Sequence, residues 1–271
     1  MLKQRIITAV ILAAIVIGSI LFAETRWVAL LFTLVLFAAA REFVLLTLKP
    51  AALVAIVAGI LFAALYWWSL AFSTAELVYA QSLVGIALWM VIAVGFIYYR
   101  HQENRPLLAR LVMLGLGLDL LWICGHGVVY LHQSYGGEIL LYMLTLVWLA
   151  DIGAYFSGRK FGKRKLAPSI SPGKTWEGVY GGVLVNLIWI LLIFWLTEGW
   201  GVGLLPFVLI GIATVSISIV GDLFESVIKR EAGVKDSGQL LPGHGGVLDR
   251  IDSVIAATPV FVSGFMIAGS A

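Results

Sequence analysis

The sequence predicts an all-α, polytopic integral membrane protein with about nine transmembrane helices. Three observations predict this fold class: the composition, the spacing of the apolar segments, and the placement of positive charge along the chain. Of the 271 residues, 61% are hydrophobic and 12% are charged, and the mean hydropathy is +1.02. A water-soluble globular protein has about 45–50% apolar and about 25% charged residues. The composition therefore excludes a soluble enzyme, a disordered tail and a nucleic-acid-binding module.

Apolar segments separated by polar breaks define the predicted spans. A helix needs about 20 residues to cross the hydrocarbon core of a bilayer. We expect helices over residues 5–23, 27–44, 51–71, 77–99, 107–131, 138–158, 178–197, 203–224 and 252–270. The first segment follows Lys3 and Arg5 as the apolar part of a signal peptide would. Eight further apolar segments follow it, so we interpret it as a retained helix.

Polar residues distinguish several of these elements. The polar run 73–76 separates the third span from the fourth. The fifth span carries Asp119 and the sixth ends at Asp151, so both have polar interiors that we expect to face the bundle or a cavity. Gly178 and Gly182 begin the seventh span as a G-x-x-x-G pair, which predicts close helix packing.

The positions of the 18 Lys and Arg residues predict the topology. When the N-terminus is placed in the cytoplasm and the sides alternate, every basic residue except Arg26 falls on the inside, as the positive-inside rule requires. Only an odd number of spans gives this division. We therefore expect a cytoplasmic N-terminus, an outside C-terminus, and two cytoplasmic loops, 159–177 and 225–251. These loops hold ten of the basic residues, which favours an anionic ligand on that side.

The end of the eighth span and the start of the ninth carry the clearest candidate chemistry. Asp222, Ser226 and Lys229 are spaced i, i+4, i+7, so a continuing helix places them on one face. Asp249 and Asp252, spaced i, i+3, share a face of the next helix. Carboxylates from two neighbouring helix ends could converge on a divalent cation, and hard oxygen ligands favour Mg²⁺. For Asp249 and Asp252, the alternative to a metal site is a favourable interaction with the macrodipole at the start of their helix.

The loop between these helices suits a phosphorylated ligand. Its lysines and arginines are the side chains that bind phosphate groups. The turn 242–246, Pro-Gly-His-Gly-Gly, supplies backbone that can approach a ligand closely. His244 is compatible either with orienting a phosphate or with a hydrogen bond inside the loop.

The other loop, 159–177, contains Gly173-Lys174-Thr175, which is similar to the end of a P-loop. The P-loop pattern fails because Pro168 stands where its first glycine belongs and because no strand is expected to precede it. A nucleotide can still bind here, but not in a P-loop fold. The basic run 159–165 is explained equally well by contact with lipid headgroups as by contact with a nucleotide.

The residues of both loops resemble a known family. Segment 226–252 reads S-x-I-K-R-x4-K-D-x-G-x2-L-P-x-H-G-G-V-x-D-R-I-D, which resembles the signature of phosphatidate cytidylyltransferases, also called CDP-diacylglycerol synthases. The upstream segments 151–159, D-x-x-A-Y-x-x-G-R, and 171–178, S-P-x-K-T-x-E-G, are also similar to that family. The resemblance covers about residues 146–271. It divides the chain into N-terminal spans, 1–137, and a C-terminal catalytic region, 138–271.

The resemblance implies an integral-membrane enzyme that converts CTP and phosphatidic acid to CDP-diacylglycerol and pyrophosphate. The compact chain suggests a bacterial inner membrane, and the positions of the basic residues suggest an active site that faces the cytoplasm. The resemblance also implies Mg²⁺ on Asp222, Asp249 and Asp252, with a second, monovalent cation such as K⁺ nearby. Lys229, together with the three aspartates, would act in catalysis, and it would contact the nucleotide phosphates beside Lys174 and Ser226. Further candidates for substrate contact are Thr175, Arg230, Lys235, His244, Gly245, Gly246, Arg250 and Asp151.

Two other functions are compatible with parts of the pattern. A transporter or channel could use the intramembrane acids Asp119, Asp151 and Asp222, but the polar chemistry is densest in the loops and no inverted repeat is visible. A lipid kinase that uses CTP as phosphoryl donor shares parts of the metal and phosphate motifs. The partners we expect are CTP, phosphatidic acid and the bilayer, with a homodimer as an open alternative and no nucleic acid.

Overall fold

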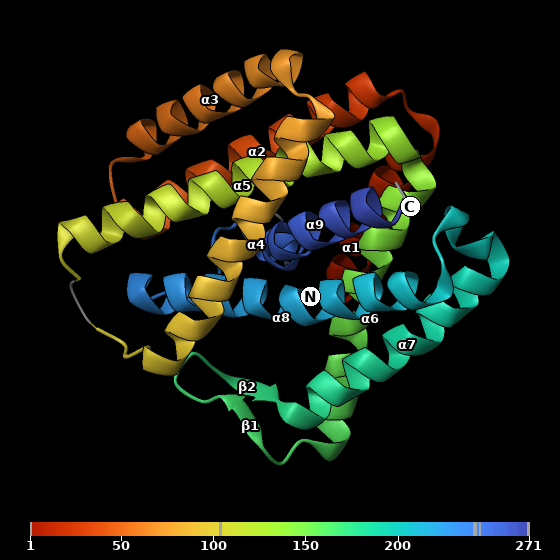
Figure 1. The fold of residues 1–271 in the computed structure, drawn as a ribbon. Coiled ribbons are helices and arrows are strands. Elements are labelled where there is room, and N and C mark those ends of the chain that lie inside the picture. Colours follow the sequence, from red (N-terminus) through yellow and green to blue (C-terminus); the bar gives the residue numbers. More distant parts are fainter. Residues whose placement is uncertain (1, 103–104, 241–242, 244, 270–271) are drawn as a thin grey trace. The chain divides into compact units, whose positions relative to one another are not determined.

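The computed structural model describes residues 2–102, 105–240, 243 and 245–269, which are helical almost throughout (Figure 1). The longer helices are α1 (Leu2–Phe22), α2 (Thr25–Leu48), α3 (Ala52–Ser69), α4 (Ala75–Tyr98), α5 (Leu107–Tyr135), α6 (Gly137–Phe161), α7 (Trp176–Thr197), α8 (Leu204–Ala232) and α9 (Leu248–Ala268). Two short 3-10 helices, η1 (Leu70–Phe72) and η2 (Glu198–Gly201), follow α3 and α7. The predicted all-α class is confirmed.

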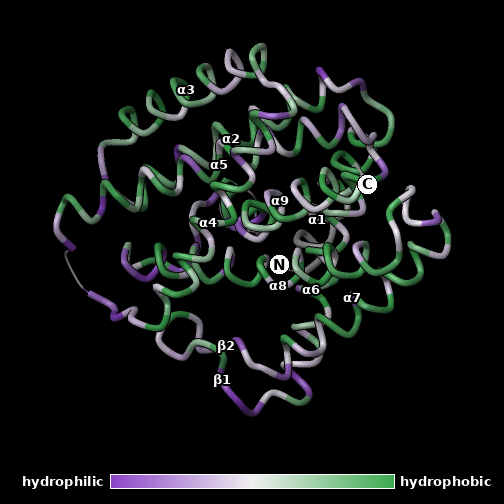
Figure 2. Tube along the Cα trace, in the orientation of Figure 1, coloured by the Kyte–Doolittle hydropathy of each residue, from purple (hydrophilic) through white to green (hydrophobic). Residues whose placement is uncertain are grey.

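The helices have the length and surface of membrane spans. Within the described residues, eight of them are long and apolar enough to cross a membrane, and the apolar stretch of α1 that qualifies as a shorter helix is Ala13–Phe22. Leu53 on α3 and Leu205 on α8 are about 70% exposed. Figure 2 shows the apolar character along these helices and the polar character of the connections between them. The chain is an integral membrane protein, while the count of nine spans and the orientation of the termini remain predictions.

The chain separates into two compact units. Unit 1 comprises Met1–Val78, His101–Leu141 and Val227–Asp252, and unit 2 comprises Tyr79–Arg100, Tyr142–Ser226 and Ser253–Ala271. Each unit therefore draws segments from both sides of the predicted boundary at residue 137. That boundary remains a prediction about where the chemistry lies, and the two units are described separately.

In unit 1, α2 packs against α3 and α5. The contact with α5 is close because Gly117 of α5 faces the ring of Phe43, where a Cβ atom would overlap that ring. At the end of α2, Lys49 adopts the left-handed conformation (φ 53°) and its N–H bonds to the carbonyl of Leu45. Pro50 follows and cannot continue a helix, so α2 ends here.

In unit 2, α6 and α7 pack through small residues. A Cβ atom on Gly182 would lie 2.8 Å from the carbonyl oxygen of Ala150, and one on Gly178 would lie 3.0 Å from that of Ala154. The predicted close-packing surface of the G-x-x-x-G pair is therefore confirmed, and its partner is α6 of the same chain. An aromatic cluster built on Tyr142, which stacks on Phe207, joins α6 to α8.

The loop 159–177 contains two short strands, β1 (Lys165–Ala167) and β2 (Ser171–Thr175), which form an antiparallel hairpin. Lys165 pairs with Thr175, and Ala167 pairs with Ser171. The expectation that no strand precedes Gly173-Lys174-Thr175 is wrong, because β1 precedes this segment and the segment itself belongs to β2. The rejection of a P-loop fold still holds, since a two-stranded antiparallel hairpin is not the strand–loop–helix unit of that fold.

Candidate functional site

A cavity of about 580 Å³ lies within unit 2, among α6, β2, α7 and α8. Four predicted site residues line it: Asp151, Lys174, Thr175 and Asp222. The Lys174 Nζ atom lies 2.6 Å from the Asp222 Oδ2 atom, and these side chains are only 25% and 30% exposed. The two groups form a charge-assisted hydrogen bond. The structure therefore brings together residues that are far apart in the sequence and that the motifs assign to one site.

The hairpin fixes the position of Lys174. The next residue, Thr175, is the N-cap of α7, and its buried hydroxyl accepts a hydrogen bond from the Gly178 N–H at 3.2 Å. Glu177 in the first turn of α7 accepts hydrogen bonds from the N–H groups of Lys163 and Arg164 at 3.0 and 3.1 Å. A further bond from Arg164 Nε to the same carboxylate raises the pKa of the Arg164 guanidinium. Both ends of the hairpin are thus attached to the start of α7.

Helix α8 continues beyond the predicted end of its span, to Ala232. Asp222, Ser226 and Lys229 therefore lie at i, i+4 and i+7 of one helix, as the sequence predicts. The Ser226 hydroxyl is 3.4 Å from Asp222 Oδ1, at the long end of the hydrogen-bond range.

In unit 1, Asp249 is the centre of a hydrogen-bonded cluster. Its Oδ1 atom lies 2.7 Å from the ammonium of Lys229, and both side chains are largely buried, 8% and 14% exposed. Its Oδ2 atom accepts hydrogen bonds from Ser237 N at 2.9 Å, from Ser237 Oγ at 2.8 Å and from Gly246 N at 2.8 Å. The carboxylate is thereby held in one orientation at the start of α9. Lys229 and Asp249, predicted from separate helices, are in direct contact.

A residue that the motifs did not include supports this cluster. Glu42 on α2 is 1% exposed. Its carboxylate accepts hydrogen bonds from Val247 N at 3.1 Å and Leu248 N at 2.9 Å, and it lies 3.1 Å from Ser237 Oγ, whose single proton it shares with Asp249. The two N–H groups belong to the start of α9, where a helix leaves its first donors unsatisfied. Glu42 thus caps α9 from another helix and fixes the loop that holds Asp249.

Glycine is required where the loop contacts Glu42. A Cβ atom on Gly246 would overlap both the Ser237 hydroxyl and the Glu42 carboxylate. Gly245 has φ +81°, a conformation that residues with a side chain rarely adopt. The sequence predicted that this turn brings backbone close to a ligand. The contacts within unit 1 show that the backbone here approaches two carboxylates of the protein itself.

The other predicted residues of this segment are less concentrated. Lys235 and Arg250 are exposed, while Asp252 is partly buried one turn after Asp249. Arg230 lines a different pocket of unit 1. His244 lies outside the described residues, so its predicted role remains a prediction.

The carboxylates match the donors that Mg²⁺ prefers, although within the described residues of either unit no three His, Cys, Asp or Glu side chains gather as a metal-binding group. Asp222 and Asp249 each have a lysine ammonium as counter-ion. Asp249 Oδ2 accepts three hydrogen bonds, so Oδ1 is the oxygen that retains a lone pair for a cation. The chemistry of these side chains therefore fits a hard divalent cation, with Asp249 contributing one oxygen.

Comparison with known proteins agrees with the motifs. The model of the cytidylyltransferase family matches residues 3–267. The chain is 42% identical to the phosphatidate cytidylyltransferase of Pseudomonas aeruginosa, over 99% of this chain and 98% of that protein. It is 33% identical to that of Bacillus subtilis, over 95% of both chains. Similarity to that of Haemophilus influenzae reaches 57% identity over 49% of this chain and 47% of the relative.

The family match includes the N-terminal helices, where the motifs gave no information. It therefore includes α2 and Glu42 as well as the two loops. From the match over nearly the whole length, we conclude that the chain belongs to the cytidylyltransferase family and is a nucleotidyltransferase.

Proposed function

We propose that the protein transfers a cytidylyl group from CTP to phosphatidic acid, giving CDP-diacylglycerol and pyrophosphate. The observation that carries this proposal is the similarity, over almost the full length of both chains, to a protein named phosphatidate cytidylyltransferase. The two Lys–Asp pairs, Lys174 with Asp222 and Lys229 with Asp249, support it. CDP-diacylglycerol is a precursor of phospholipids, which agrees with an enzyme embedded in the bilayer.

The reaction needs charge neutralisation more than proton transfer. An oxygen of the lipid phosphate attacks the α-phosphorus of CTP, and the bond from that phosphorus to the oxygen bridging to the β-phosphate breaks. Pyrophosphate leaves with the electron pair. The lipid phosphate monoester is mostly dianionic at neutral pH, so no strong general base is required. The obstacle is the approach of two anions, which positioned positive charge can relieve.

The chain's own residues supply that charge and its orientation. We assign Lys174 and Lys229 to the phosphates of the nucleotide, with Ser226 as a hydroxyl donor. Asp222 and Asp249 hold the two ammonium groups in place in the absence of substrate. Thr175 and Asp151 line the same cavity as Lys174, which supports their assignment to substrate contact. Arg230, Lys235, His244, Gly245, Gly246 and Arg250 keep their predicted assignment to substrate contact.

The proposed metal requirement rests on the carboxylates. Asp222, Asp249 and Asp252 are the residues that we assign to Mg²⁺, and a monovalent cation such as K⁺ is a further proposal. Bound Mg²⁺ would neutralise charge on the triphosphate and on the leaving pyrophosphate. Lys229, which contacts Asp249 in the absence of substrate, would exchange that contact for a phosphate oxygen when CTP binds.

The cellular setting follows from the charge distribution. The positive-inside pattern places both loops in the cytoplasm, where CTP is available, and the bacterial relatives point to the inner membrane. The acyl chains of the lipid substrate would remain in the bilayer during the reaction. A homodimer remains open, although the Gly178–Gly182 surface is already used by α6.

The direct test is label transfer by the purified protein in mixed micelles with phosphatidic acid and Mg²⁺, with and without EDTA. We expect the α-phosphate label of CTP to enter the lipid phase as CDP-diacylglycerol, and this transfer to be lost with EDTA. Transfer of the γ-label to a lipid alcohol would instead show a kinase. If neither label moves, the proposal is overturned, and solute flux in proteoliposomes would test for a transporter.

A variant of Lys174 tests the cavity in unit 2. Lys174→Ala removes an ammonium from this cavity and leaves Asp222 without its ion-pair partner. We expect the KM for CTP to rise about tenfold or more, since hydrogen bonds to charged groups contribute about 1.5–3 kcal/mol. The measurement is the initial rate of CDP-diacylglycerol formation across CTP concentrations.

Arg164→Ala is the matched control for this prediction. Arg164 lies in the same loop and pairs with Glu177, but the Arg164 side chain is 65% exposed. An ion pair at such an exposed position contributes little to stability. We expect its KM to stay within about twofold of the unsubstituted protein. Equal effects of the two variants would show that Lys174 is only one of several interchangeable loop charges.

A further inference from the structure

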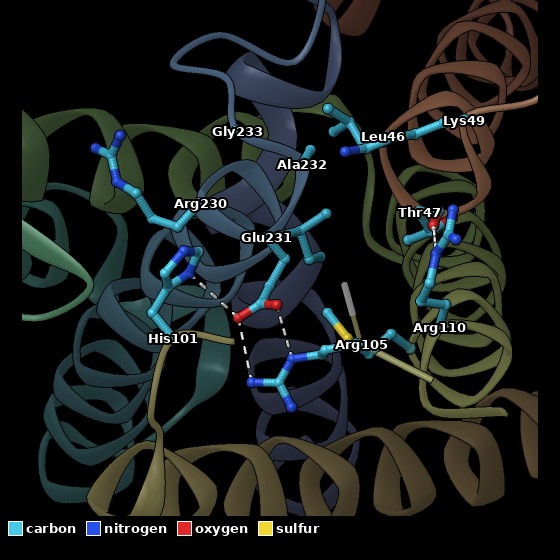
Figure 3. Close-up of a pocket in the computed structure, with 12 residues that line it drawn as sticks. Leu46, Thr47, Lys49, His101, Arg105, Arg110, Arg230, Glu231, Ala232 and Gly233 are labelled. Carbon is cyan, nitrogen blue, oxygen red and sulfur yellow. Dashed lines mark hydrogen bonds and ion pairs between the residues drawn. The ribbon is translucent and has the colours of Figure 1, made fainter. Parts of the chain in front are cut away.

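A second pocket, of about 320 Å³, lies wholly within unit 1 (Figure 3). It is formed by the end of α2, the chain entering α5 together with its first turns, and the end of α8. The aspartate cluster around Asp249 does not line it. Of its lining residues, Arg230 alone has a role in the reaction proposed above.

The pocket has a large excess of positive charge. Its basic residues are Lys49, His101, Arg105, Arg110 and Arg230. Glu231 is the acidic residue in the lining. With His101 neutral, the four permanent cations exceed the single carboxylate by three.

The one carboxylate is already neutralised. Glu231 is 10% exposed and forms two contacts with the Arg105 guanidinium, Nε to Oε2 at 2.8 Å and Nη2 to Oε1 at 3.1 Å. The His101 Nδ1 atom lies 3.6 Å from the same carboxylate. Figure 3 shows both side chains directed at Glu231. Both carboxylate oxygens of Glu231 are therefore in contact with Arg105.

Arg110 and Lys49 supply the uncompensated donors. Arg110 Nε donates to the carbonyl oxygen of Thr47 at 2.6 Å, which fixes the guanidinium against the end of α2. Within the described part of the chain, its terminal amino groups and the Lys49 ammonium have no partner. The left-handed backbone of Lys49 places that residue at the rim of the same pocket. A guanidinium fork and a lysine ammonium that line one pocket are a typical arrangement for binding phosphate oxygens.

We propose that this pocket binds a phosphate group, carried either by the headgroup of an anionic lipid or by a small soluble phosphate ester. Leu46, Met113 and Ile228 line it beside the cations, so an amphiphilic ligand can bury apolar atoms while its phosphate meets the basic groups. Its volume is at the small end of the range for ligand pockets, about 300–1,000 Å³, which suits a headgroup better than a nucleotide. The site is additional to the proposed reaction and does not depend on it.

The test is a binding titration on the full-length protein in neutral detergent, followed by native mass spectrometry. The probes are phosphatidylglycerol, chosen because it is not the proposed substrate, and glycerol 3-phosphate. The pocket variant is Lys49→Asn together with Arg110→Gln. Asparagine tolerates the left-handed conformation of residue 49, and glutamine can still donate to Thr47. Arg230 is left unchanged because it is assigned to substrate contact.

The control removes the same charge elsewhere. Lys160→Gln with Lys163→Gln lowers the net charge by two at exposed residues of the other loop, outside the pocket. We expect the pocket variant to weaken binding about tenfold or more, because two charge-assisted contacts are lost, and the control to stay within about twofold. Saturable binding of phosphatidylglycerol that glycerol 3-phosphate does not displace identifies a lipid ligand. Equally tight, variant-sensitive binding of glycerol 3-phosphate identifies a soluble one.

Equal affinities of the pocket variant and the control would overturn the proposal, as would the absence of saturable binding of either probe. If the double variant does not purify as a folded protein, Lys49→Asn alone carries the test, since Lys49 is exposed. For that variant we expect an affinity loss of about threefold. None of these readouts measures turnover, so the outcome is separate from that of the label-transfer experiment.

Discussion

Glu42→Ala is expected to lower turnover of CTP and phosphatidic acid by about a hundredfold or more. The substitution leaves the N–H groups of Val247 and Leu248 without their common acceptor, and the Ser237 hydroxyl keeps Asp249 alone. Each buried donor left unsatisfied costs about 1–3 kcal/mol. The loop that orients Asp249 then loses its attachment to α2. The measurement is kcat and KM together with the melting temperature in detergent.

A conservative variant separates positioning from general stability. Glu42→Gln keeps the size and one acceptor oxygen, so we expect it to recover much of the melting temperature, while kcat stays about tenfold low because its amide group donates where an acceptor is needed. Glu24→Gln is the control, since Glu24 precedes the same helix but is 70% exposed and pairs with the exposed Arg26. A Glu42→Ala protein with normal kcat would refute the positioning role.

Asp249→Asn is expected to abolish turnover while the protein remains folded. An asparagine has one acceptor oxygen and one NH₂ group where the aspartate has two acceptor oxygens. Its NH₂ group would face either the Lys229 ammonium or the N–H donors of Ser237 and Gly246, so one of these contacts would bring two donors together. The negative charge that holds Lys229 is also lost. We expect a fall in kcat of about a thousandfold or more, measured as CDP-diacylglycerol formed, since charge in the site is the main catalytic resource.

A double-variant comparison makes this prediction sharper. If Lys229 and Asp249 act as one unit, Lys229→Ala combined with Asp249→Asn will be little slower than Asp249→Asn alone. Glu138→Gln, at an exposed acidic residue in the first turn of α6, serves as the control and should keep full activity. Near-normal activity of the asparagine variant would remove Asp249 from the site. Fully additive losses would show that the pair acts at separate steps.

Most of the fold could be predicted because apolar runs and polar breaks are local signals. The predicted seventh span, 178–197, differs from α7 (Trp176–Thr197) by two residues. The ninth was expected from residue 252, whereas α9 begins at Leu248. Its first turn is capped by Glu42, about 200 residues earlier, and no local pattern can show that. The hairpin was missed because SPGKT has no alternation of apolar and polar residues to indicate a strand.

Residues of the candidate site could be predicted from the sequence where the type of side chain itself indicates a chemical role. The contact of Lys229 with Asp249 joins two residues of the recognised signature, but their distance could not be deduced from spacing. Glu42 had a usable signal, since an ionisable group near the end of an apolar span is costly and commonly functional. Asp119 and Asp151 carry the same signal, but Glu42 lies outside the recognised motifs, which all fall after residue 146, so the sequence did not connect it with the site.

The attachment of the last loop to α2 also has a consequence for biosynthesis. Glu42 enters the membrane with the second helix, whereas its donors lie 195 to 206 residues further along the chain. Until that late segment is made, α2 carries an acidic side chain without these three partners, which is unfavourable in an apolar environment. Unit 1 can therefore be completed only after nearly the whole chain has been synthesised. A nascent protein that stops before residue 237 retains this unsatisfied acid, a feature by which quality-control proteases could distinguish it from the finished enzyme.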